Sequence, residues 1–236
     1  MVSIGEAAEQ LGISIDTLRR WDNKRKLSAI RIGDKGTRYY KQSDLDFLLE
    51  KPYALAKNWA ASDKADKPQV QYYCETRDIF QARLERFQTE LKSILSEDNT
   101  ALLTAIAGEI GNNSYDHNLG NWKDIMGIFF AYSLAERVVI LADRGQGILK
   151  TLKRVRPNLT NHNEALFTAF TENISGRHPE SRGNGLKFVR QVVTESSFSL
   201  VFQTGNAELK LENRNDKIEV IETNSNVDGC LAIINF

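Results

Sequence analysis

A polar cluster follows an apolar segment near the middle of the chain, in the sequence GEIGNNSYDHN that begins at Gly108. If this segment is helical, Glu109 and Asn113 stack one turn above each other. Asp116 and His117 follow one turn later on the same face. Burying such a row costs free energy unless it binds something. A carboxylate, a carboxamide and an imidazole facing one cavity suit a hydrated metal ion and a polyphosphate. An ordinary exposed polar face is the alternative.

Two short glycine motifs follow, each beside a predicted element of secondary structure. The first, Asp143-Arg-Gly-Gln-Gly147, comes directly after the apolar run 138–142, which predicts a buried strand. The second, Arg182-Gly-Asn-Gly-Leu186, precedes the helix-like segment 187–193. Each motif is common by itself. The order ExxxN, then DxGxG after a strand, then GxGL before a helix is specific.

This order of motifs resembles the ATP-binding domain shared by gyrase, sensor histidine kinases, mismatch-repair ATPases and anti-sigma-factor kinases, known as the GHKL or Bergerat fold. The resemblance covers residues 99–236 and implies a two-layer α/β sandwich that binds ATP and Mg²⁺. By this resemblance Asp143 accepts a hydrogen bond from the amino group of adenine. Gly145 and Gly147 let the backbone approach the base. The carbonyl of guanine would leave a buried carboxylate unpaired there, which favours adenine.

The same resemblance assigns the chemistry at the triphosphate. Asn113 is expected to ligate Mg²⁺ together with phosphate oxygens. Glu109 is expected to orient and deprotonate water as a general base. For His117 a structural role is the better interpretation.

The phosphate-binding loop is expected at the second glycine motif. Residues 148–181 would form a lid that closes over the nucleotide. Arg182 would reach the phosphates, with an exposed loop charge as the alternative. Gly183 and Gly185 would place backbone amides at the phosphates, where Leu186 enters the next helix.

Alternating segments predict an antiparallel sheet around this site. Paired strands are expected at 122–133 and 138–142, and four further strands at 198–204, 207–212, 217–221 and 230–236. Cys230 stands where the resembling proteins frequently carry a threonine, which puts one water-mediated contact with adenine in doubt.

The first fifty residues carry the pattern of a helix-turn-helix with a wing. Ser3, with Glu6 three residues later, forms a capping-box sequence, and Gly12 ends that helix. A second helix, two short strands and a third helix are expected at 15–21, 30–32, 37–40 and 44–49. Two short helices joined at a glycine predict a helix-turn-helix.

Charge indicates that this segment binds DNA. Nine basic and three acidic residues lie between Ser14 and Lys41, a net charge of +6 that matches the electrostatic footprint of duplex binding. A solvated basic surface or a small protein-binding module is the alternative. The sequence SIGEAAEQLGISIDTLRRWDNKRKL followed by GTRYY resembles the MerR and excisionase-like winged helix-turn-helix family. The residues that this resemblance places against double-stranded DNA are Thr17, Arg19, Arg20, Arg38, Tyr39 and Tyr40.

The chain is therefore expected to be of the α+β class, with two domains. Residues 1–50 would be the winged helix-turn-helix, 51–74 a linker of mixed Pro, Ala, Ser, Asp and Lys, and 75–236 the GHKL-type domain with an N-terminal helix. Apolar residues recur at helical spacing between Glu75 and Leu95. They indicate a helix packed on the ATP-binding domain, a dimerisation helix that replaces the coiled coil of MerR regulators, or both.

Composition and the absence of targeting segments indicate where in the cell the protein is expected. The net charge is zero, so the whole chain has no bulk attraction to nucleic acid. Cys74 and Cys230 give no disulfide framework. With neither a signal peptide nor a membrane span visible, we expect a cytoplasmic protein that does not bind membranes.

Together the two resemblances predict a transcription regulator whose DNA binding is coupled to ATP binding or slow hydrolysis. It would be a homodimer, at least when bound to ATP or DNA. One alternative is a GHKL-type protein kinase acting on a partner protein. The three histidines, His117, His162 and His178, all lie in the predicted ATP domain, which speaks against autokinase activity. The other alternative is a nucleotide sensor without turnover, against which the intact Glu109 argues mildly.

Overall fold

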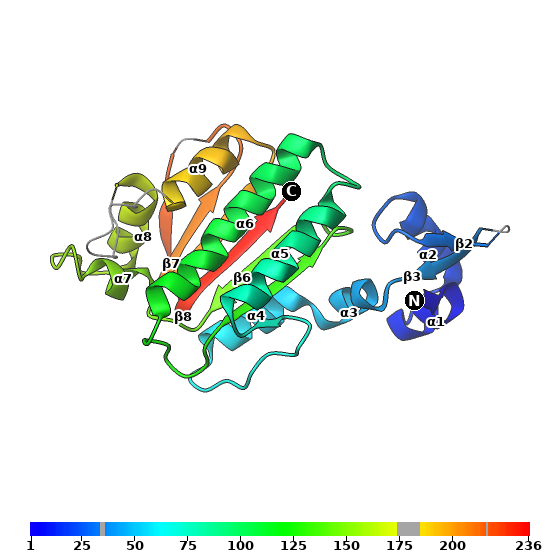
Figure 1. Cartoon of the computed structure of the whole chain (residues 1–236), viewed down its shortest axis with the longest axis horizontal. Coiled ribbons are helices and arrows are strands. Elements are labelled where there is room, and N and C mark those ends of the chain that lie inside the picture. Colours follow the sequence, from blue (N-terminus) through cyan, green and yellow to red (C-terminus); the bar gives the residue numbers. More distant parts are fainter. Residues whose placement is uncertain (34–35, 174–184, 216) are drawn as a thin grey trace. The chain divides into compact units, whose positions relative to one another are not determined.

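The chain folds into two compact units of the predicted α+β class (Figure 1). The computed structural model describes residues 1–33, 36–173, 185–215 and 217–236. The first unit comprises residues 1–55 and 133–137, and the second comprises residues 56–132 and 138–236. Among the described residues, no helix is both long enough and apolar enough to cross a membrane.

The first unit has the predicted helix-turn-helix and wing. Its elements are β1 (Val2–Ser3), α1 (Ile4–Leu11), α2 (Ile15–Asn23), β2 (Ile30–Ile32), β3 (Thr37–Tyr40) and α3 (Gln42–Glu50). The strands form an antiparallel sheet in the order β1-β3-β2. The capping box is confirmed, because Ser3 accepts a hydrogen bond from the Glu6 amide while the Glu6 carboxylate accepts one from the Ser3 amide. Gly12 ends α1 in the left-handed conformation.

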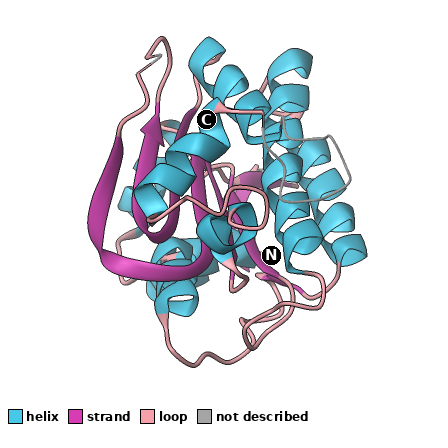
Figure 2. Cartoon of the chain, turned by 90° about the vertical axis from the view of Figure 1, so that its left-hand side faces the viewer, coloured by secondary structure: helices cyan, strands magenta, loops and turns pink. Residues whose placement is uncertain are grey.

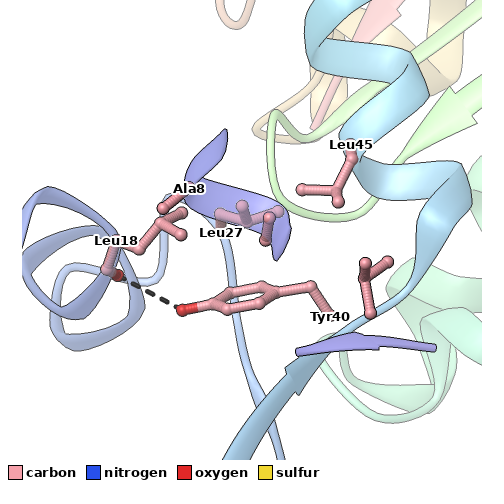
Figure 3. Packing of buried hydrophobic residues seen from close by; sticks show 7 residues of the cluster. Ala8, Leu18, Leu27, Tyr40 and Leu45 are labelled. Carbon is pink, nitrogen blue, oxygen red and sulfur yellow. Dashed lines mark hydrogen bonds between the residues drawn. The ribbon is translucent and has the colours of Figure 1, made fainter. Parts of the chain in front are cut away.

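A small apolar core holds these helices against the wing (Figure 3). Leu18 of α2, Leu27, Tyr40 of β3 and Leu45 of α3 are fully buried in it. The Tyr40 hydroxyl donates a 3.5 Å hydrogen bond to the backbone oxygen of Leu18, drawn as a dashed line in Figure 3. The orientation of α2 relative to the wing is therefore fixed by packing.

The second unit is a sheet covered by helices. It contains residues 56–61 of α4 (Pro52–Ala61) and all but the last residue of β5 (Ile128–Ser133). Its other elements are β4 (Tyr73–Cys74), α5 (Arg77–Leu91), α6 (Glu97–Asn118), β6 (Val138–Asp143), α7 (Gly147–Leu152), α8 (His162–Thr171), α9 (Gly185–Glu195), β7 (Ser199–Leu211) and β8 (Val220–Asn235). The five strands lie in the order β4-β5-β6-β8-β7. Figure 1 shows α5, α6 and α9 across one face of the sheet, and Figure 2 shows the strands in magenta with cyan helices beside them.

Helix α5 confirms the prediction of a packed helix. Its apolar stripe (Phe80, Leu84, Phe87 and Leu91) is buried. Phe80 meets Phe130 of the sheet edge to face, with ring centroids 5.2 Å apart. Because this stripe is already covered within one chain, it is not available as the seam of a dimer.

Two details of the predicted sheet are wrong. The strand expected at 122–133 begins only at Ile128. The four later segments form two long strands, β7 and β8. In β7 the chain continues through Gly205 instead of turning there. Gly205 has a φ of 55°, and the pairing of β7 with β8 shifts register on both sides of it. A bulge of this kind keeps a strand continuous while bending it.

The segment 51–74, for which the sequence predicts a linker, contains ordered elements. It includes α4 and β4. The side chains of Trp59, Tyr72 and Tyr73 are buried, and Tyr72 stacks on Phe129 of β5 with centroids 5.1 Å apart. The aromatic residues explain why this segment is ordered, since each of them buries a large apolar area.

Close packing of α5 on α6 gives a test of the fold. A Cβ on Gly111 would collide with the ring of Phe80, whereas one on Gly108 would lie 3.1 Å from the flexible end of Leu84. Gly111→Ala is expected to lower the free energy of unfolding by about 1–3 kcal/mol, as overpacked cores do. Gly108→Ala is the matched control on the same helix and should cost less. Urea unfolding measures both. Equal stability of the two variants would contradict this packing.

Candidate functional site

Asp143 is the most deeply buried carboxylate of the predicted nucleotide site. It ends β6, as predicted, and is 2% exposed. Ser114 Oγ donates to its Oδ2 at 2.8 Å, and Asn118 Nδ2 to its Oδ1 at 3.3 Å. The amide of Gly145 donates to Oδ1 at 2.8 Å. Burial raises the pKa of Asp143, and these donors oppose that rise.

The motifs in the sequence do not assign a role to Ser114 and Asn118. They lie four apart on α6, each directly after a residue of the polar row described above. Their signal was present in the helical spacing, but only the fold shows that this second row turns toward the end of β6. Asn118 also accepts a 2.8 Å hydrogen bond from the Gln146 amide, so one side chain holds both ends of the DxGxG loop.

The glycines of this region are required by close approach. A Cβ on Gly145 would collide with the amide of Asn118, and one on Gly229 would collide with Asp143. Gly147 has a φ of 69° and lies against Thr204. Residues with a side chain at Gly145 or Gly229 would therefore push α6 or β8 away from Asp143.

A hydroxyl lies beside Cys230, on the neighbouring strand. Thr204 of β7 pairs with Cys230 of β8 in the sheet register. Its Oγ1 donates to the Gly229 carbonyl at 2.8 Å and accepts from the Ile148 amide at 3.2 Å. Burial raises the pKa of the Cys230 thiol well above its usual range, so the neutral thiol is favoured.

Glu109 and Asn113 form a second group one turn earlier on α6. Asn113 Nδ2 donates to Glu109 Oε1 at 3.1 Å. A Cβ on Gly185 would collide with the Glu109 carboxylate, so the first residue of α9 passes directly against it. Leu186 lies in the first turn of α9, while Arg182 and Gly183 lie outside the described residues.

His117 is half-buried near the end of α6, and its backbone oxygen accepts a 2.9 Å hydrogen bond from Gln146 Nε2. Within the described ranges, no group of three or more His, Cys, Asp and Glu side chains could hold a metal ion alone. Glu109 and Asn113 together suit Mg²⁺ that is shared with phosphate oxygens, because Mg²⁺ is usually held by few protein ligands plus phosphates.

In the first unit, Asp22 connects α2 to the wing. It accepts hydrogen bonds from Arg38 Nε at 2.7 Å, from Arg31 Nη2 at 2.9 Å and from the Ala29 amide at 2.9 Å. Burial opposes the charge of Asp22, but the Ala29 amide and Arg38 hold its pKa below the usual value. Arg38 therefore has a structural contact in addition to its predicted place at DNA.

The other predicted DNA-contacting residues differ in exposure. Thr17 and Ser14 share a 3.0 Å hydrogen bond at the start of α2. Arg19 is exposed and pairs with Asp16 at 2.9 Å. Arg20 is exposed on α2, and Tyr39 is half-buried.

Tyr40 requires a correction, because its side chain is fully buried in the core shown in Figure 3. Its ring cannot touch a DNA backbone in this conformation. The GTRYY sequence alternates along β3, which places neighbouring tyrosines on opposite faces of the strand. The alternation of side chains along the strand was the signal available in the sequence. In the structure it places Tyr40 on the face that packs into the core.

Comparison with known proteins identifies the first unit. Residues 3–40 match the model of the MerR family regulatory protein. The chain is also 34% identical over 62 residues to the type II methyltransferase M.Eco47II of Escherichia coli. That match covers 26% of this chain and spans about 15% of the length of the methyltransferase. Residues 3–40 of the chain thus form a MerR-family helix-turn-helix domain.

The contacts of the arginines give a test of the DNA surface. Arg20→Ala should weaken binding to all DNA sequences and flatten the salt dependence by about one unit of slope, as expected for a lost phosphate contact. Its thermal stability should stay unchanged, because its side chain is exposed. Salt-titrated fluorescence anisotropy and thermal unfolding measure the two effects.

Arg38→Ala is expected to weaken DNA binding and also to lower the stability of the first unit. It removes a donor from the partly buried Asp22 and should lower the free energy of unfolding by about 1–3 kcal/mol. Full stability together with weakened DNA binding would show that Arg38 serves DNA alone. Unchanged DNA binding in both arginine variants would contradict the assignment of this surface.

Proposed function

We propose that this DNA-binding regulator couples DNA binding to ATP binding or slow ATP hydrolysis in its second unit, which we assign to the GHKL type. The observation that carries the proposal is the buried carboxylate of Asp143 at the end of β6, surrounded by donors and by glycines. A buried carboxylate is costly unless it is paired or used. The resemblance of the motif order to ATP-binding domains supplies the ligand.

An adenine amino group could donate a hydrogen bond to Asp143 if one existing donor, the Ser114 hydroxyl, turned away. Both carboxylate oxygens accept hydrogen bonds from the protein. The Ser114 hydroxyl also lies 3.5 Å from the backbone oxygen of Ile110. Turning its hydrogen to that carbonyl opens an acceptor position on Oδ2 for an amino donor. Guanine, which has a carbonyl at this place, has no donor to offer.

Glu109 and Asn113 fit the other end of the nucleotide. Bound Mg²⁺ would neutralise charge on the phosphates when present. Asn113 holds Glu109 in one orientation through their 3.1 Å hydrogen bond, with the start of α9 against the carboxylate. In this position Glu109 would accept the proton of a water molecule. A nucleotide sensor without turnover would make the same contact between Asp143 and adenine, but Glu109 would not accept a proton from water.

Coupling to DNA has a simple form in this proposal. MerR-type sites with two-fold symmetry need two DNA-binding domains, and a pair binds far better than one. ATP-dependent pairing of two copies would therefore raise DNA affinity. DNA binding measured without nucleotide, with ADP and with a non-hydrolysable ATP analogue tests this, together with gel filtration. Equal DNA affinity in all three states would overturn the coupling.

Asp143→Asn should abolish most ATP binding, because the amide can present its own donor to the adenine amino group. Calorimetry gives the affinity, and circular dichroism checks the fold. Ser114→Ala is a useful companion: it leaves an acceptor open on Asp143 and should retain ATP binding. Unchanged ATP affinity of Asp143→Asn would remove the adenine assignment.

Glu109→Gln should separate binding from turnover. The amide keeps the size of the side chain and the contact with Gly185, so Mg-ATP binding should persist. Hydrolysis should fall by about 10²-fold or more, as for loss of a general base. Asn113→Ala should instead lose the Mg²⁺ dependence of binding. Steady-state phosphate release and calorimetry with and without Mg²⁺ distinguish them. Wild-type turnover in both variants would place catalysis elsewhere.

A further inference from the structure

Arg144, the second residue of the DxGxG motif, is fully buried, and the nucleotide contacts proposed above do not use it. Its Nε donates to Asp124 Oδ1 at 2.9 Å and its Nη2 to Asp124 Oδ2 at 2.6 Å. This two-pronged pair raises the pKa of Arg144 and lowers that of Asp124. A buried guanidinium needs such pairing, and removing one partner is costly.

The third contact of Arg144 is to helix α4. Nη1 donates to the backbone oxygen of Trp59, and the guanidinium carbon lies 5.9 Å from the centre of the Trp59 ring. Helix α4 is continuous from Pro52 to Ala61, and the boundary between the two units falls after Leu55. Arg144 therefore fixes the helix that leaves the DNA-binding unit to the DxGxG loop.

Arg144 also adjoins the residues around Asp143. Its neighbour in the chain is Asp143, and its Nη2 lies 3.7 Å from Asp228. Asp228 precedes Gly229, which has no room for a side chain because Asp143 lies against it. A change in the position of Asp143 moves the backbone of Arg144, and the two-pronged pair resists sliding because both bonds must break together.

We propose that Arg144 is a positioning residue that transmits occupancy of the Asp143 pocket to helix α4. The inference rests on the proposed function, since it needs a nucleotide at Asp143. Exchange of the Ser114 hydroxyl for an adenine amino group changes the contacts of Asp143, and Arg144 carries that change to the Trp59 carbonyl. Nucleotide binding then changes how firmly the helical structure of α4 is held. This helix connects the DNA-binding unit to the second unit.

Hydrogen exchange of the segment 52–61 in the full chain tests this, with and without a Mg²⁺-loaded non-hydrolysable ATP analogue. Calorimetry with the same analogue is run in parallel. In the wild type the analogue should change exchange in α4 by about fivefold or more, the lower range of coupling between sites. Arg144→Lys keeps the charge without the planar fork, and Asp124→Asn weakens the same pair from the other side. Both should bind the analogue but lose this response.

Lys123→Ala is the matched control, because it removes the 2.6 Å ion pair with Asp228 but leaves both hydrogen bonds of the Arg144–Asp124 pair in place. It should keep the response. A purely structural role for Arg144 predicts faster exchange in α4 by the same factor with and without analogue. That result, or a full response in Arg144→Lys, overturns the inference. An unchanged α4 in a wild type that binds the analogue also overturns it, even where both variants unfold. Absence of analogue binding to the wild type refutes the proposed function instead.

Discussion

The second unit depends on one costly group, the carboxylate of Asp143 buried at the end of β6. Its oxygens accept hydrogen bonds from α6 through Ser114 and Asn118, and from the loop that follows through the Gly145 amide. A buried charge persists only where its hydrogen bonds are satisfied. Helix α6, strand β6 and the glycine loop must therefore meet at one point. Glu109 and Asn113 lie one turn earlier on the same helix, where the Glu109 carboxylate lies against the first residue of α9.

The MerR-family unit also has an acidic side chain that accepts several hydrogen bonds. Asp22 gathers Arg31, Arg38 and the Ala29 amide, and so holds the wing against α2. The exposed basic residues are then displayed on a fixed frame. In both units an acidic side chain organises the element that would meet a negatively charged ligand. Arg144 and Asp124 repeat the arrangement with the signs exchanged, at the end of α4.

Local signals made much of the fold predictable. The Ser3 capping box, the stripe of α5 and the strand before Asp143 each depend on residues close in sequence, and each is confirmed. Features set by contacts distant in sequence were missed. The bulge at Gly205 resembled a turn, and the donors Ser114 and Asn118 needed β6 as a partner. The sequence assigns no role to Arg144, because only the fold brings Asp124 and the Trp59 carbonyl to it.

We propose that Asp143 binds the amino group of adenine. Calorimetric titration of the wild-type chain with ATP and then with GTP, each with Mg²⁺, tests it most directly, since the two share the same triphosphate. ATP is expected to bind at least about tenfold more tightly than GTP, because an unpaired buried acceptor costs about 1–3 kcal/mol. Equal affinities, or tighter binding of GTP, would contradict the claim.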